Sequence, residues 1–199
     1  YMLTIAGIGP GNPRYLTLDV KKKIEEAEYI LAFGRVAKSL EYIRKDIIQV
    51  NKVDEVIKYL DKDREILLLA SGDPDFFGIV DFIKKKEIKI KEVLPGLSSF
   101  QYLMAKLQKP WQNANFLSLH GRSGSLDNIK QNKLSILLID KENTPSKISK
   151  DLYNLGIKGK IHVGYNLSYD EEIIITKNIG EEIEDISPLG VVVIENEMD

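Results

Sequence analysis

The feature that most constrains the fold is an apolar run that stops at a turn-forming tetrapeptide. Residues 67–78 read LLLASGDPDFFG, a buried strand that ends at Ser-Gly-Asp-Pro before apolar residues recur with helical spacing. In an open α/β sheet, ligands bind at the loops that follow the carboxyl ends of the strands. Gly72 permits close approach of the backbone, and Pro74 biases Asp73 toward an extended conformation. The sequence therefore predicts Asp73 in a ligand-facing loop; the alternative is that Ser-Gly-Asp-Pro is only a turn.

Two more glycine-bearing loops follow strands in the same half of the chain. A strand over residues 2–9 runs into Pro10, and a strand over residues 88–94 runs into a loop that carries Ser98 and Ser99. If these strands share a parallel sheet with the Asp73 strand, the loops meet at one edge. Backbone amides, two hydroxyls and one carboxylate then form a single site, suited to a ribose or an amino-acid head group.

The glycine spacing in GIGPG (7–11) also invites comparison with a dinucleotide-binding fingerprint. That fingerprint requires a helix that opens directly on the glycines. Here prolines intervene, and the next helix is predicted to begin with Thr17 as its N-cap. A nicotinamide-dependent oxidoreductase would also place an acidic residue at the end of the second strand, where residues 33–35 read Phe-Gly-Arg. This class remains an alternative.

The apolar pattern breaks near residue 110, which predicts a domain boundary there, with domains over residues 1–110 and 115–199. In the second half, several β-branched segments follow one another without helical segments between them, so two or three strands should pair antiparallel. The expected fold class is α/β, with a mainly parallel sheet in the first half, a mixed sheet in the second, and a cleft between the halves.

Composition excludes several function classes. The chain of 199 residues has a net charge of -2, which argues against a nucleic-acid binder that relies on a strongly basic surface. It contains no cysteine, which excludes thiolate metal sites and cysteine nucleophiles. The presence of only two histidines also argues against a histidine metal centre. We expect no metal. Without a long apolar run or a signal-peptide pattern, the cytoplasm is the expected location.

Four motifs carry a family resemblance: GIGPG, SGDPDFFG, LPGLSSF and SLHGR. In their order and spacing, the chain resembles the tetrapyrrole methylases, S-adenosylmethionine-dependent enzymes of the cobalamin pathway. SLHGR (118–122) and the short length resemble the cobalt-precorrin-7 (carbon-5) methyltransferase branch most closely. The resemblance implies two αβα domains, a homodimer, S-adenosylmethionine (product S-adenosylhomocysteine) in the interdomain cleft, and a separate decarboxylating C15-methyltransferase as partner.

The resemblance also assigns site residues. The tetrapyrrole carries acetate and propionate groups, which call for cationic donors. The candidates for this substrate role are Arg14, Arg35, His120 and Arg122. Of these, His120 and Arg122 are the candidate catalytic residues, and His120 is also a candidate carrier of the departing proton. The implied cofactor contacts are Pro10, Asp73, Phe76, Ser98, Ser99, Ile139, Tyr165, Asn166 and Leu189.

The chemistry of methyl transfer agrees with the residues present. A sulfonium methyl group is already a strong electrophile, so transfer depends on alignment and on exclusion of water, and no nucleophile and base pair is expected. Three alternatives stay open. They are a sister methylase acting at another ring position or on a protein or RNA, the nicotinamide-dependent oxidoreductase, and a non-catalytic sensor of the cofactor.

Overall fold

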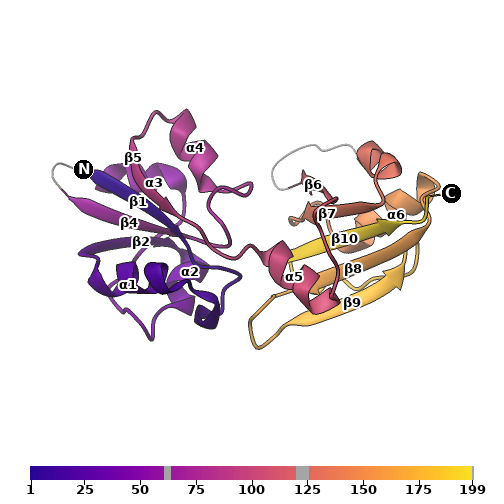
Figure 1. Ribbon diagram of the computed structural model, residues 1–199, viewed down its shortest axis with the longest axis horizontal. Helices are drawn as coiled ribbons and strands as arrows, with labels where there is room; N and C mark the ends of the chain where they lie inside the picture. The colour runs from indigo at the N-terminus through magenta and orange to yellow at the C-terminus, as the bar shows by residue number, and fades with distance from the viewer. Residues whose placement is uncertain (61–63, 120–125, 199) are drawn as a thin grey trace. The chain divides into compact units, whose positions relative to one another are not determined.

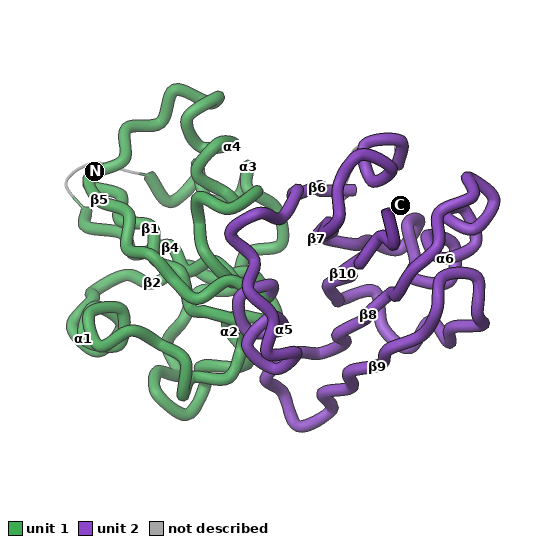
Figure 2. The backbone as a smooth tube through the Cα atoms, turned by 45° about the vertical axis from the view of Figure 1, so that its right-hand side comes forward, with its two compact units in different colours: residues 1–99 green, residues 100–199 purple. Residues whose placement is uncertain are grey.

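The computed structural model describes residues 1–60, 64–119 and 126–198. Its backbone contacts divide the chain into two compact units, residues 1–99 and residues 100–199 (Figure 2). This division lies earlier than the boundary predicted near residue 110, because helix α5 (Ser99–Leu107) packs on the sheet of the second unit.

The described part of the first unit contains a sheet of five strands, all of them parallel, which confirms the predicted mainly parallel sheet. The strand order is β3-β2-β4-β1-β5. Because the strands run the same way, their carboxyl ends and the loops that follow lie at one edge. The strands are β1 Met2–Gly7, β2 Tyr29–Phe33, β3 Ile48–Val50, β4 Glu65–Ala70 and β5 Ile90–Leu94.

Helices cover both faces of this sheet (Figure 1). Helices α1 (Leu18–Glu26) and α2 (Gly34–Ser39) bury apolar side chains against one face. Helices α3 (Val53–Tyr59) and α4 (Ile79–Lys85) bury theirs against the other. Strand side chains alternate between the two faces, so the near-continuous apolar runs of β1 and β4 supply both cores.

The start of α1 follows the expected capping pattern. The Thr17 hydroxyl accepts a hydrogen bond from the Val20 amide at 3.2 Å, which confirms Thr17 as the N-cap. A short 3-10 helix, η1 (Pro13–Tyr15), stands between the first glycine loop and α1. No helix therefore opens on the glycines of residues 7–11, and the dinucleotide fingerprint is not formed there.

The second unit has a mixed sheet, as predicted, in the order β6-β7-β10-β8-β9. β6 pairs parallel with β7, whereas β10 pairs antiparallel with both β7 and β8, and β8 pairs antiparallel with β9. The expected antiparallel pairing of the β-branched segments is confirmed. The strands are β6 Asn115–Ser118, β7 Leu134–Leu138, β8 Gly159–Tyr165, β9 Ile173–Asn178 and β10 Gly190–Asn196.

This sheet is also covered on both faces. Helix α6 (Pro145–Asn154) and the 3-10 helix η2 (Leu126–Gln131) pack on one face, over the largest apolar cluster of the unit. Helix α5 covers the other: the Phe100 ring lies edge-on to Phe116 of β6, with centroids 5.0 Å apart. Both units are therefore αβα layers. Within the described ranges, no helix is long and apolar enough to cross a membrane.

A polar chain runs across the α5 face of the second sheet. The buried His162 imidazole contacts the Thr176 hydroxyl through Nδ1 at 2.7 Å and the Glu195 carboxylate through Nε2 at 2.5 Å. The Lys109 ammonium, just beyond α5, lies 3.0 Å from the same carboxylate oxygen. Because His162 is only 4% exposed and both of its ring nitrogens are engaged, we interpret these contacts as a structural link between the strands and the segment that follows α5.

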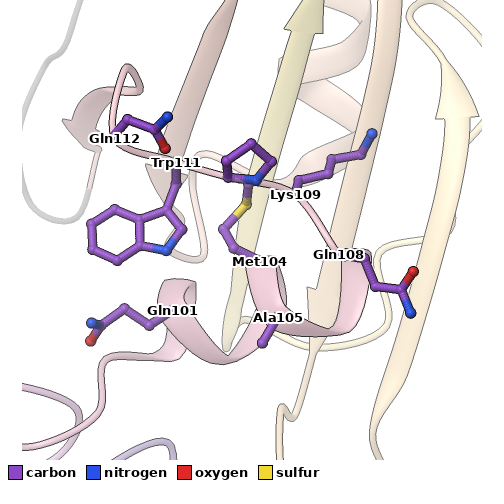
Figure 3. A pocket seen from close by; sticks show the side chains of 8 residues that line it. Gln101, Met104, Ala105, Gln108, Lys109, Trp111 and Gln112 are labelled. Atoms are coloured by element: carbon purple, nitrogen blue, oxygen red, sulfur yellow. The ribbon is translucent and has the colours of Figure 1, made fainter.

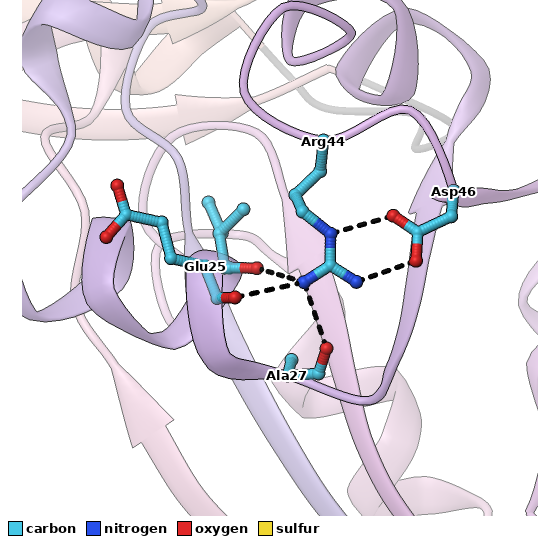
Figure 4. Close-up of polar contacts among 5 residues, drawn as sticks. Glu25, Ala27, Arg44 and Asp46 are labelled. Atoms are coloured by element: carbon cyan, nitrogen blue, oxygen red, sulfur yellow. Dashed lines mark hydrogen bonds and ion pairs between the residues drawn. The ribbon is translucent and has the colours of Figure 1, made fainter.

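In the first unit, Arg44 ties the end of one helix to a later loop (Figure 4). Its guanidinium donates to the carbonyls of Ile24, Glu25 and Ala27 at 2.9 to 3.2 Å, which satisfies carbonyls left free at the end of α1. It also pairs with both oxygens of the Asp46 carboxylate at 2.7 Å. The hydrogen bond from Arg44 holds the pKa of Asp46 below its usual value.

Replacing Arg44 with Met should lower the free energy of unfolding by about 2 kcal/mol, because carbonyls at the end of α1 lose a charged donor. Urea denaturation followed by circular dichroism measures this change. Asp46→Asn is the matched control: it keeps the arginine on the carbonyls and should have a smaller effect. Equal losses in the two variants would contradict the capping role.

The acid side of the stability curve should depend on Glu195. Burial opposes ionisation of this carboxyl, but hydrogen bonds and charge from His162 and Lys109 prevail, and its pKa lies below the ordinary value of 4.5. A lowered folded pKa gives stability that is present above pH 4.5 and lost as the pH falls through the folded value. Urea midpoints measured across this range should fall less steeply for Glu195→Gln than for the wild type. Identical slopes would show that the contact adds no pH-dependent stability.

Candidate functional site

The first and second glycine loops meet at the carboxyl edge of the parallel sheet. The Gly72 amide donates to the Gly9 carbonyl at 2.7 Å, and the Gly9 amide donates to the Gly72 carbonyl at 3.3 Å. Both residues have positive φ, +78° at Gly9 and +65° at Gly72, a region that favours glycine. The expectation that these loops share one edge is confirmed.

The third loop completes a cradle of three glycines, Gly7, Gly72 and Gly96. A Cβ atom added at Gly7 would lie 2.4 Å from the Gly72 carbonyl oxygen, and one added at Gly96 would lie 2.3 Å from the same atom. No side chain larger than hydrogen fits at Gly7 or Gly96 unless the backbone moves. The absence of side chains at these positions therefore lets the three loops meet backbone to backbone at this edge of the sheet.

Asp73 holds two of these loops together. Its Oδ1 atom accepts from the Asp75 amide at 2.9 Å, and its Oδ2 atom accepts from the Gly96 amide at 3.2 Å. The carboxylate is therefore fixed at the edge of the sheet, as the sequence predicts. It also acts as a positioning group, a role that the motif alone did not reveal.

The other predicted cofactor contacts of the first unit also follow β1, β4 and β5. Pro10 comes directly after Gly9 and is partly buried. The Ser98 side chain is buried, and its Cα atom lies 3.7 Å from a Cβ built at Gly72. Phe76 is partly buried on the Asp73 loop, and Ser99 begins α5. The structure thus places Pro10, Asp73, Phe76 and Ser98 in the glycine loops at one edge of the sheet.

The predicted substrate contacts are described only in part. Arg14 lies in η1, after β1, and Arg35 lies in the first turn of α2, after β2; both are exposed. Each follows the carboxyl end of a strand, on the same edge of the sheet as the cradle. His120 and Arg122 lie outside the described residues.

The four predicted residues of the second unit converge around Gly190. A Cβ built at Gly190 would lie 3.1 Å from Ile139 Cδ1, and Gly190 is the register partner of Tyr165. The Asn166 amide donates to the Leu189 carbonyl at 3.3 Å. These four residues, far apart in sequence, therefore form one neighbourhood.

The side chains of these four residues differ in how far they are exposed to a ligand. Ile139 and Tyr165 belong to the apolar core, and the Tyr165 hydroxyl donates to the Glu184 carbonyl at 3.0 Å. Burial, with the nearby Asp185 carboxylate, raises the pKa of Tyr165 to about 12. Asn166, with φ of +47°, and Leu189, which is 48% exposed, are the members whose side chains reach the surface.

A separate hollow of about 420 Å³ lies beside α5 in the second unit (Figure 3). None of the predicted site residues lines it. Its polar side-chain groups are neutral amides, the Trp111 indole N–H and the Lys109 ammonium, which already pairs with Glu195, so we assign it no ligand. The lining residues are Gln101, Met104, Ala105, Gln108, Lys109, Pro110, Trp111 and Gln112. Among the described residues, no cluster of three His, Cys, Asp or Glu residues could hold a metal ion.

Comparison with known proteins gives one family. The family described as Tetrapyrrole (Corrin/Porphyrin) Methylases matches residues 2–182. The chain is 30% identical, over 90% of its length and 90% of the relative's, to a probable cobalt-precorrin-7 C(5)-methyltransferase of Methanocaldococcus jannaschii. It is 26% identical to the cobalt-precorrin-7 C(5)-methyltransferase of Salmonella typhimurium, over 87% of this chain and 89% of that protein.

Solved structures show the same fold. A precorrin-6Y methylase of cobalamin biosynthesis from Archaeoglobus fulgidus superposes with a TM-score of 0.75 at 22% identity, over 99% of both chains. A uroporphyrin-III C-methyltransferase from Thermus thermophilus, solved in complex with S-adenosylhomocysteine, gives a TM-score of 0.78 at 20% identity, over 98% of this chain and 92% of that one.

The cradle should tolerate no side chain at Gly96. Gly96→Ala should cost roughly 2 kcal/mol or more of unfolding free energy, because the new Cβ meets a carbonyl oxygen at 2.3 Å. Gly156→Ala is the control: φ there is +77° with nothing within 4 Å, so only the left-handed strain of about 1 kcal/mol applies. Urea denaturation of both variants tests the prediction, and a smaller loss at Gly96 than at Gly156 would contradict it.

Proposed function

We propose, on the premise that this chain belongs to the tetrapyrrole (corrin/porphyrin) methylase family, that it methylates ring carbon 5 of a cobalt-precorrin in cobalamin biosynthesis. It is an S-adenosylmethionine-dependent methyltransferase. Membership of the family confirms the resemblance inferred from the four sequence motifs.

The choice of carbon 5 rests on two observations. Both relatives described above are named for that position, at 30% and 26% identity over most of their length. The SLHGR motif supports the same branch. A methyl group found on any other ring carbon would assign the protein to a different methyltransferase activity of the same family.

The glycine cradle is the observation that carries the cofactor assignment. S-adenosylmethionine, when bound, supplies an electrophilic methyl group. At the cradle, the absence of side chains at Gly7 and Gly96 lets the three loops meet backbone to backbone, and Asp73 keeps the third loop in register with the second. Pro10, Phe76 and the two serines of the third loop complete the proposed contacts, joined by Asn166 and Leu189, and by Ile139 and Tyr165 through their backbone.

The remaining roles follow from the charge of the substrate. Arg14 and Arg35 are proposed to bind its carboxylates, because both are exposed cations on loops or helix starts that follow strand ends. His120 and Arg122 are proposed as the catalytic pair. We further propose that the protein is a cytoplasmic homodimer and that a separate decarboxylating C15-methyltransferase acts in the same pathway; sedimentation analysis tests the dimer.

Calorimetric titration should show binding of S-adenosylhomocysteine and none of NADH. Asp73→Ala should weaken S-adenosylhomocysteine binding about tenfold or more, because the Gly96 loop loses a charged acceptor and the ligand loses a fixed carboxylate. Asp75→Ala, in the same loop, keeps the amide that Asp73 accepts from and should bind as the wild type does. NADH binding alone would overturn the methylase assignment. Unchanged affinity in a folded Asp73→Ala variant would remove Asp73 from the site.

The position of methylation requires a product analysis. Incubation of cobalt-precorrin-7 with S-adenosylmethionine that carries a ¹³C-labelled methyl group should place the label on carbon 5, as read by NMR spectroscopy. Label on another carbon would contradict the carbon-5 assignment while leaving the family activity intact. Cofactor binding without transfer to any tetrapyrrole would favour a non-catalytic sensor.

A further inference from the structure

Phe77 adopts a backbone conformation that aromatic residues rarely occupy. Its φ angle is +49°, in the left-handed region, where Cβ crowds the following carbonyl group. The side chain is also 42% exposed, so a large apolar ring faces solvent. A glycine or asparagine at this position would relieve the strain and remove the exposed ring. Neither folding stability nor solubility explains a phenylalanine here.

The loop that imposes this conformation is the loop that carries Asp73. The Phe76 amide donates to the Asp73 carbonyl at 3.3 Å, and the Val80 amide donates to the Pro74 carbonyl at 3.2 Å. At Gly78, a Cβ atom would lie 2.2 Å from the Pro74 carbonyl oxygen, so the chain folds tightly back on itself. Strain of this kind persists only where surrounding contacts over-determine the backbone, and it concentrates at functional sites.

Phe76 supports the exposed ring from behind. The two rings meet edge-on, with centroids 4.8 Å apart at an interplanar angle of 65°. Phe76 is partly buried, whereas Phe77 projects farther into solvent. The pair therefore presents one braced aromatic surface four residues from Asp73.

We propose that Phe77 is a specificity-determining residue, whose ring packs against the conjugated macrocycle of the tetrapyrrole. This inference rests on the proposed function, because the macrocycle is the flat, apolar part of that substrate. Arginines bind its peripheral carboxylates and so recognise the rim of the ring system. An aromatic side chain instead recognises its face, through apolar contact and stacking. The strained loop thereby places the substrate beside the group that positions the cofactor loops.

Phe77→Gly separates this role from a structural one. Glycine accepts a φ of +49° without strain, which offsets its greater freedom in the unfolded chain and the lost contact with Phe76, so the fold should be about as resistant to urea as the wild type. The probe is cobyrinic acid, a cobalt corrin that bears acetate and propionate groups, titrated by calorimetry in the presence of S-adenosylhomocysteine. We expect its affinity to fall about tenfold, with S-adenosylhomocysteine affinity unchanged within about twofold. Phe77→Tyr should retain the affinity for the corrin.

Phe82→Ala is the matched control. Phe82 is 38% exposed on α4, in the same unit, and has an ordinary helical backbone, so its loss should leave corrin binding unchanged.

Corrin binding by Phe77→Gly equal to that of the wild type would overturn the proposal. So would a shift in sedimentation with unchanged corrin binding, which would assign the exposed ring to contact with a second copy of the chain. If the wild type binds S-adenosylhomocysteine but no corrin, the proposed substrate class fails, and this inference fails with it. If the wild type binds neither, the cofactor assignment fails first.

Discussion

The close contact of three backbones at the carboxyl edge of the parallel sheet is the constraint on which the candidate site depends. The Gly72 carbonyl oxygen lies where any side chain at Gly7 or Gly96 would have to go. Three consecutive neighbours in the sheet, β4, β1 and β5, can therefore deliver their loops to one point. The carboxylate of Asp73 then links the outer two loops across β1. The carboxylate takes this position because the strands bring the two loops together: one of its hydrogen-bond donors, Asp75, lies on its own loop, and the other, Gly96, lies on the loop after β5.

Much of the fold could be predicted from local sequence patterns. Buried parallel strands read as continuous apolar runs, which is why β1 and β4 were recognisable, and the Thr17 cap marked the start of α1. The division between the units was harder to predict, because Pro110 and Trp111 interrupt the apolar pattern after α5, whereas the change in packing comes at the start of the helix. Helix α5 joins the second unit through contacts such as Phe100 on Phe116, which no local pattern reveals.

In the candidate site, too, local features were predictable and those that depend on tertiary packing were not. Glycine and proline mark loops in a sequence, so the three loops of the first unit and the fixed carboxylate were predictable. The burial of the predicted contact side chains was not predictable. Ile139 and Tyr165 lie near Gly190 with the other predicted residues of the second unit, yet both side chains belong to the core. The chain from Thr176 through His162 to Glu195 joins three strands, and only the register of the sheet brings these residues together. The strained φ of Phe77 likewise depends on how residues 73–80 close, although the doubled phenylalanine was a visible signal.

The strand order of the first unit has a consequence for how the protein is made. β1 ends at Gly7, but its two neighbours in the sheet are β4, which begins at Glu65, and β5, which begins at Ile90. During synthesis, the amino-terminal strand therefore leaves the ribosome long before either partner exists. In this interval, pairing within the sheet is confined to β2 with β3. The first strand is thus an unpaired apolar edge for most of the translation of its unit, the condition in which nascent chains associate wrongly or engage chaperones. The loops that form the cradle come together last, when β5 docks.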